Sequence, residues 1–167
     1  MKFPDPPRGA KAIPWRLPIW FYRAGLGWLL GNRMLLLSHT GRKSGKIRQN
    51  VLEVIDSTTD KQSYTVVSGF GPKSDWYQNI SLNPDVELQV GMEKYRATAY
   101  HLDLDESEKV FLDYVNKFPR VFRSLANLIG YEIDHTPEGY REFARQIPII
   151  KFAIKDPRKT NHMLKEE

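Results

Sequence analysis

The sequence LLLSHTGRKSGKIRQN, at residues 35–50, joins two apolar segments through a basic turn that contains two glycines. Gly41 and Gly45 can adopt backbone angles that side chains disfavour, so successive N–H groups of the turn could converge on one anion. Hydroxyl and cationic side chains add charge-assisted hydrogen bonds. The candidate anion ligands are Arg42, Lys43, Ser44, Gly45, Lys46 and Arg48. The turn therefore predicts phosphate binding, and the alternative is a hairpin turn whose charges are merely solvated.

The spacing of this turn is not that of a Walker-type P-loop. Its second glycine comes too early, and Lys46 is followed by Ile47 rather than by serine or threonine. The chain also contains no Gly-x-Ser-x-Gly elbow and no Rossmann glycine pattern after a strand. These patterns disfavour a nucleotide triphosphatase, a serine hydrolase and a Rossmann dehydrogenase.

The composition predicts one cytoplasmic domain. The chain has 167 residues, 41% of them hydrophobic, and a formal net charge of +5, so it can bury a single core. The absence of cysteine excludes disulfides, thiolate zinc sites and cysteine nucleophiles, and it agrees with a reducing compartment. We expect no nucleic-acid partner, because the positive charges form no long run. We also expect no metal site, because the four histidines lack a paired spacing. His39 lies beside the basic turn and either contacts a ligand or is structural.

The first part of the chain is rich in proline and then in aromatic residues. Five prolines within residues 1–18 predict an extended N-terminal arm. The segment IWFYRAGLGWLL, at residues 19–30, predicts a short apolar helix that packs in the core and is too short to span a bilayer. The alternative is an interfacial helix that places Trp20, Tyr22 and Trp28 at the headgroups of a membrane, beside arginines.

Short apolar or alternating segments predict a β-meander followed by further strands. The expected strands cover residues 34–37, 51–55, 63–67, 86–90, 95–102 and 147–154. Residues 19–155 would form the single domain, and residues 156–167 a charged C-terminal tail.

Helix signals lie between and after these strands. Asp105 with Glu108 predicts a capping-box start, which makes these carboxylates caps rather than catalysts. Pro119 can open a second helix that ends at Gly130, and Thr136 precedes a third.

The segment SGFGPKSDWYQNISLNP, at residues 68–84, is the second informative stretch. Ser74 is a good N-cap for a short helix that Asn83-Pro84 would end. The glycines before that helix and its free N–H groups could face a ligand, with Trp76 offering a ring for stacking. The alternative is that Trp76 simply plugs the end of the β structure.

Two stretches together resemble the deazaflavin-dependent nitroreductase family. They are residues 35–50, quoted above, and DWYQNISLNPDVELQV at residues 75–90, and a weaker likeness extends to RQIPII at residues 145–150. Members of that family adopt a split β-barrel related to flavin-binding reductases. The resemblance therefore implies an α+β fold, a split β-barrel flanked by helices.

The resemblance also implies a cofactor, an activity and site residues. In that family the basic turn holds the phosphate and acidic tail of coenzyme F420, and the loop before the short helix lies along the deazaflavin ring. The implied tail ligands are Arg42, Lys43, Ser44 and Arg48, and the implied ring-side contacts are Val67, Ser68 and Gly69. Tyr140 is the counterpart of a substrate-segment tyrosine, a proton donor or pocket residue. The implied activity is hydride transfer from reduced F420 to a quinone, nitroaromatic or similar small electrophile.

Three alternatives remain open at this point. An FMN-dependent reductase of the same fold could use the same basic turn for a shorter phosphate. A non-catalytic cofactor carrier or a membrane-surface binding protein would belong to different functional classes. The sequence leaves both a monomer and a homodimer open.

Overall fold

Six antiparallel strands close into a barrel. The computed structural model describes residues 1–155 of the chain. The strand order is β1-β2-β3-β6-β5-β4, and β4 pairs with β1 to close the barrel. This architecture confirms the expected α+β barrel flanked by helices. The strands are β1 (Met34–Thr40), β2 (Ile47–Ser57), β3 (Ser63–Val67), β4 (Asp85–Val90), β5 (Glu93–His101) and β6 (Ile149–Ile154).

Side chains that alternate along the strands fill the barrel. Leu35 and Leu37 of β1 are fully buried, and they belong to one core with Leu88 of β4 and Phe152 of β6. His39 follows Leu37 by two residues and is 2% exposed. Because residues i and i+2 of a strand share a face, His39 continues the row of buried β1 side chains up to the basic turn.

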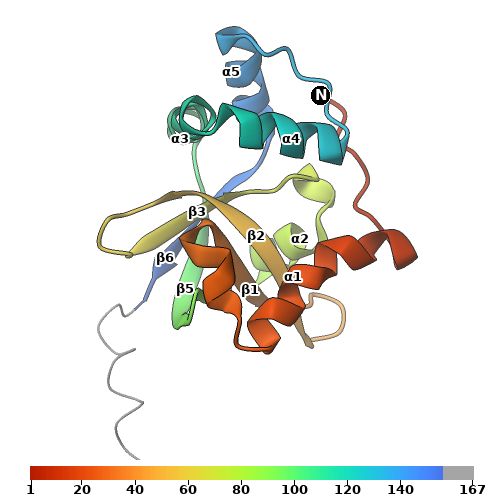
Figure 1. The fold of residues 1–167 in the computed structure, drawn as a ribbon, viewed down its shortest axis with the longest axis vertical. Helices are drawn as coiled ribbons and strands as arrows, with labels where there is room; N and C mark the ends of the chain where they lie inside the picture. The colour runs from red at the N-terminus through yellow and green to blue at the C-terminus, as the bar shows by residue number, and fades with distance from the viewer. Residues whose placement is uncertain (156–167) are drawn as a thin grey trace, which may run out of the picture.

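Three helices form a layer over one end of the barrel (Figure 1). Phe111, Phe122 and Phe143, one from each helix, have ring centroids 5.2–5.9 Å apart in a second hydrophobic core. Thr136 accepts a hydrogen bond from the Gly139 N–H, which confirms the predicted start of the last of these helices. The layer consists of α3 (Leu104–Lys117), α4 (Pro119–Ile129) and α5 (Pro137–Gln146).

The cap of α3 is not the predicted one. The Asp103 carboxylate accepts a hydrogen bond of 2.8 Å from the Glu106 N–H, whereas Asp105 lies inside the first turn. We expect Asp103→Ala to lower the free energy of unfolding by about 1 kcal/mol, because it removes the acceptor for a free helix N–H group. Urea unfolding of this variant beside Asp105→Ala would check the assignment. A larger loss for Asp105→Ala would contradict it.

The expectation of an extended N-terminal arm over residues 1–18 is wrong from residue 9 onward. A 3-10 helix, η1 (Gly9–Ala12), leads into α1 (Ile13–Arg23), and a second 3-10 segment, η2 (Gly27–Arg33), follows. Pro14 sits in the first turn of α1, where no N–H is needed, and Pro18 lies inside the helix. The charged tail expected at residues 156–167 lies outside the described residues.

The expectation that the apolar N-terminal helix packs in the core is also wrong. Tyr22 is the buried residue of α1, whereas Trp20 is 63% exposed and Trp28 of η2 is 60% exposed. Within residues 1–155, no helix has both the length and the hydropathy needed to cross a bilayer. The exposed large apolar side chains of this segment are Ile13, Trp15, Leu17, Trp20, Phe21, Leu26, Trp28 and Leu29.

Candidate functional site

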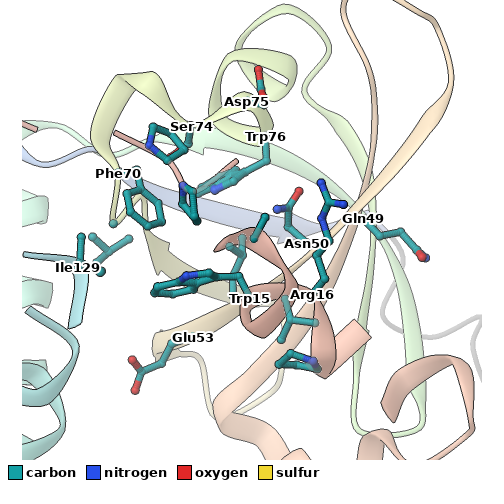
Figure 2. Close-up of a pocket in the computed structure, with 18 of the residues that line it drawn as sticks. Trp15, Arg16, Gln49, Asn50, Glu53, Phe70, Ser74, Asp75, Trp76 and Ile129 are labelled. Atoms are coloured by element: carbon teal, nitrogen blue, oxygen red, sulfur yellow. The ribbon is translucent and has the colours of Figure 1, made fainter. Parts of the chain in front are cut away.

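A cavity of about 1240 Å³ lies between the N-terminal helix, the barrel and the helical layer. Figure 2 shows Trp15 of α1, Phe70, Trp76 and Ile129 around its apolar part, with Asn50 of β2 facing the same space. The basic β1–β2 turn also contributes to the lining, as do aromatic residues of α3 and α4. One cavity thus joins a cationic wall to an apolar one.

The basic turn presents side chains, rather than backbone amides, to this cavity. The N–H groups of Gly41, Ser44 and Gly45 donate to carbonyls inside the turn, at 2.8–3.2 Å. The expectation that successive N–H groups converge on an anion is therefore wrong. Gly45 has φ +65° and shapes the turn without lining the cavity. The predicted residues of the turn that do line the cavity are Arg42, Lys43, Ser44 and Arg48.

Arg42 is held by a short helix, α2 (Asp75–Leu82). Its backbone N–H and its Nη1 donate to Asn79 Oδ1 at 3.0 and 2.9 Å. Its Nη2 forms an ion pair of 3.0 Å with Asp75 Oδ1. Sequence reasoning missed Asn79, because nothing in the local pattern of α2 indicates that it meets a turn more than thirty residues earlier.

The loop between β3 and α2 brings two of its three predicted residues to the cavity. Val67 and Gly69 line it. Ser68 is fully buried, donates to the Gly71 carbonyl at 2.8 Å and lies 2.9 Å from the Ser74 hydroxyl. Ser68 therefore stabilises the loop through hydrogen bonds without lining the cavity. Ser74, the predicted N-cap, shares one of these hydrogen bonds and makes no capping hydrogen bond.

Trp76 combines the two roles considered for it. Its side chain is 6% exposed and packs in the barrel core, as the plugging alternative expects. It also lines the cavity, where Figure 2 shows it above Trp15.

The sequence comparisons agree with this arrangement of barrel, basic turn and cavity. Residues 16–127 match a family described as F420H(2)-dependent quinone reductase. The chain belongs to the F420H(2)-dependent quinone reductase family. This membership confirms the expected oxidoreductase class and the expected cofactor, coenzyme F420.

Two relatives of this reductase come from Mycobacterium tuberculosis. Rv3178, whose assignment as an F420H(2)-dependent quinone reductase is itself provisional, is 32% identical over 92 residues, which cover 53% of this chain and 75% of the relative. The F420H(2)-dependent quinone reductase Rv1261c is 38% identical over 68 residues, which cover 39% of this chain but only 44% of the relative. Rv1261c is therefore matched over less than half of its length.

A solved structure supports the fold of this family member. The structure titled F420-H2 dependent reductase (FDR-A) aligns with a TM-score of 0.50 and 23% sequence identity, over 73% of this chain and 95% of that one. At this identity the likeness concerns the fold alone.

The donor groups of the cavity fit the cofactor of the family. Lys43 and Arg48 are exposed cations at its mouth, and Ser44 adds a hydroxyl, a set suited to phosphate and carboxylates. The apolar wall offers ring faces for a flat heterocycle. The volume also exceeds the usual range for a site that holds one small ligand, about 300–1,000 Å³.

Tyr140 is not among the residues that line the cavity of this reductase. Its ring packs edge-on against Phe122, and its hydroxyl lies 3.2 Å from His135 Nδ1. The structure therefore does not bring Tyr140 to the other predicted site residues. Tyr131 does line the cavity and donates a hydrogen bond of 2.8 Å to the Gly69 carbonyl.

We expect Tyr131→Phe to lower the free energy of unfolding by about 1–2 kcal/mol, because it leaves the carbonyl of Gly69 without its donor. Tyr140→Phe is the matched control, since its hydroxyl contacts an exposed histidine, and it should change stability by less than about 0.5 kcal/mol. Chemical denaturation of both variants would check this. Equal losses of unfolding free energy in the two variants would show that the hydrogen bond from Tyr131 to Gly69 does not contribute specifically to stability.

A carboxylate that the sequence did not single out also lines the cavity. Burial raises the pKa of Glu53 on β2, although Arg33 Nη2 lies 3.1 Å from its Oε1 and opposes that rise. The buried hydroxyl of the neighbouring Tyr114 of α3 faces this carboxylate and also opposes the rise in the Glu53 pKa. Burial and the nearby Glu53 carboxylate both raise the pKa of Tyr114.

Proposed function

We propose that the protein binds reduced F420 and a small quinone in the one cavity and reduces the quinone there. The observation that supports this is the continuity of the cavity from the cationic turn to the aromatic wall of the helical layer. An anionic cofactor tail suits the first region, and an apolar acceptor suits the second. When bound, reduced F420 supplies the hydride.

We assign the binding roles by position in the cavity. Lys43, Arg48 and Ser44 would bind the phosphate and acidic tail of the cofactor. Arg42, which Asn79 holds in place, would face the same anionic groups. Val67, Gly69 and Trp76 would lie beside the ring and exclude water from it. Gly45, Ser68 and Tyr140 are not part of the proposed site, because none of them lines the cavity. Gly45 and Ser68 shape the backbone of their loops instead.

Two measurements test this proposal. Fluorescence titration with oxidised F420 and, separately, with FMN should give tighter binding of F420, because the cationic turn would have a longer acidic tail to contact. Oxidation of reduced F420, followed without oxygen, should then depend on protein and on an added naphthoquinone. Preferential binding of FMN would reassign the protein to flavin reductases. Binding of F420 without turnover on any quinone or nitroaromatic would support a cofactor carrier.

We also propose that α1 and η2 contact an anionic membrane surface. Trp20 and Trp28 are exposed, and the Arg23 guanidinium lies 5.3 Å from the centre of the Trp20 ring. Arg16 and Arg33 belong to the same N-terminal segment. Interfacial tryptophan combined with arginine is typical of helices that lie at anionic headgroups.

Vesicle sedimentation tests the membrane proposal. The full chain should sediment with vesicles that contain phosphatidylglycerol and less with pure phosphatidylcholine, and the double variant Trp20→Glu and Trp28→Glu should lose that binding. Leu104→Glu, an exposed apolar residue on α3, is the matched control and should sediment like the unmodified chain. Unchanged sedimentation of the double variant would contradict the proposal. If that variant also converted a dimer to a monomer, the tryptophans would belong to a contact between protein chains instead.

A further inference from the structure

One buried histidine connects the barrel interior to the cationic turn. His39 of β1 has its Nε2 3.0 Å from Asn50 Oδ1 of β2 and its Nδ1 3.1 Å from Asn79 Nδ2 of α2. An amide nitrogen only donates and an amide oxygen only accepts, so Nδ1 accepts and Nε2 carries the proton. The contacts thus define a neutral imidazole in the Nε2–H tautomer.

The orientation of Asn79 is fixed independently of the histidine. Its Oδ1 accepts from both the backbone N–H and the Nη1 of Arg42, so its Nδ2 must face His39. Turning the carboxamide around would place its NH2 group against two donors of Arg42. Asn79 therefore satisfies Arg42 and His39 together in one orientation, and this orientation requires His39 Nδ1 to be unprotonated.

We propose that His39 is a positioning residue, whose neutral imidazole orients Asn79 and through it holds Arg42 in place within the basic turn, beside the proposed anion site. This inference rests on the proposed function, because it takes the turn as the site of the anionic tail. A protonated His39 would have two donors, and its Nδ1–H would oppose the Asn79 amide. Either Asn79 would turn and Arg42 would lose its hydrogen bonds to Asn79, or Asn79 would stay and lose its hydrogen bond to His39.

The charged groups around His39 favour the neutral form. Burial lowers the pKa of His39 and the Arg48 guanidinium adds to this, whereas the Asn50 hydrogen bond and the Asp75 carboxylate act in the opposite direction. Arg48 is the cross-strand neighbour of His39, Asp75 lies on α2, and Arg42 is the remaining charged group of the network.

The positioning role and a simple charge effect predict opposite changes in anion affinity when His39 is protonated. A positive charge gained by His39 would strengthen anion binding by Coulomb attraction alone. If His39 positions Arg42, the same proton weakens anion binding, because a charge-assisted donor is displaced from the site. The pH dependence of cofactor affinity therefore separates the two.

The affinity for oxidised F420 should be measured at about pH 7.5 and about pH 5, where ordinary carboxylates remain largely ionised. We expect about tenfold weaker binding at the lower pH, the loss of one charge-assisted contact. His39→Gln cannot gain a proton, so its affinity should not change with pH. Asn79→Ala breaks the link but keeps a titrating His39, so its affinity should be weaker than that of the unmodified chain at the higher pH and should not weaken further at the lower pH. His101→Gln is the matched control, since His101 does not line the cavity, and it should keep the unmodified profile. Unchanged or tighter binding by the unmodified chain, at a pH where the ring-nitrogen resonances show His39 to be protonated, would overturn the proposal.

Nuclear magnetic resonance supplies a readout that needs no cofactor. The ring nitrogens of His39 should show the Nε2–H tautomer at neutral pH, and the Arg42 Nε–H resonance should shift with the His39 titration. That coupling should vanish in Asn79→Ala, where His39 is still present. If no form of the protein binds F420 while the coupling is seen, the proposed function fails and the positioning role stands. An Arg42 resonance that ignores His39 would overturn the positioning role.

Discussion

Lys43→Glu is expected to weaken F420 binding by about 10- to 150-fold at low ionic strength. Lys43 is exposed at the mouth of the cavity, in a turn whose backbone N–H groups are mostly occupied by internal hydrogen bonds. Side-chain charge must then account for anion binding, and one charge-assisted contact contributes about 1.5–3 kcal/mol. That free energy corresponds to the stated range of affinity. Fluorescence titration with oxidised F420 measures it.

Lys109→Glu is the control for this charge reversal. Lys109 is exposed on α3 and does not line the cavity, yet its replacement changes the net charge by the same amount. We expect less than a twofold effect on F420 affinity, because Lys109 is exposed and outside the cavity, so its charge acts on a bound anion only through water. Similar losses of F420 affinity in the two variants would indicate that the net charge of the protein, rather than a contact with Lys43, affects binding. Lys43 would then not belong to the site.

The second large effect is expected in the helical layer. Phe111 is 1% exposed, and its ring lies 5.2 Å from that of Phe122 and 5.3 Å from that of Phe143. Phe111→Ala should lower the free energy of unfolding by about 3–5 kcal/mol, because it removes buried apolar surface and leaves a void that close packing cannot fill. Urea unfolding followed by circular dichroism measures this loss.

Phe111→Leu keeps most of the buried apolar volume, so its loss should be clearly smaller. Phe111 also lines the cavity, and the alanine variant therefore enlarges its apolar wall. If the cavity binds the acceptor there, the alanine variant should change the apparent affinity for quinone more than the affinity for F420. A loss below about 1 kcal/mol for the alanine variant would mean that the layer rearranges around the missing ring.

Local patterns were enough to predict most of the strands and the helix starts at Pro119 and Thr136, whereas closure of the strands into a barrel was implied by the family resemblance. Alternation in strands and the chemistry of helix ends depend on near neighbours, which the sequence displays. Long-range contacts were the part that could not be predicted. The pairing of His39 with Asn79 and the occupation of the turn's N–H groups depend on tertiary geometry.

The N-terminal segment shows where a sound local rule fails. Proline disfavours a helix interior, but Pro18 removes only a single backbone hydrogen bond from α1. The prediction of core packing failed for a different reason. Apolar content along residues 19–30 was interpreted as burial, although the barrel and helical layer already have complete cores of their own.

The position of β6 in the barrel has a consequence for synthesis of the chain. β6 pairs with both β3 and β5, so these two strands each keep an unpaired edge until residues 149–154 have been made. An open edge invites pairing with another chain. A nascent chain that carries the first five strands is thus exposed to aggregation until the sixth arrives, and premature termination before β6 should yield insoluble rather than partly active protein.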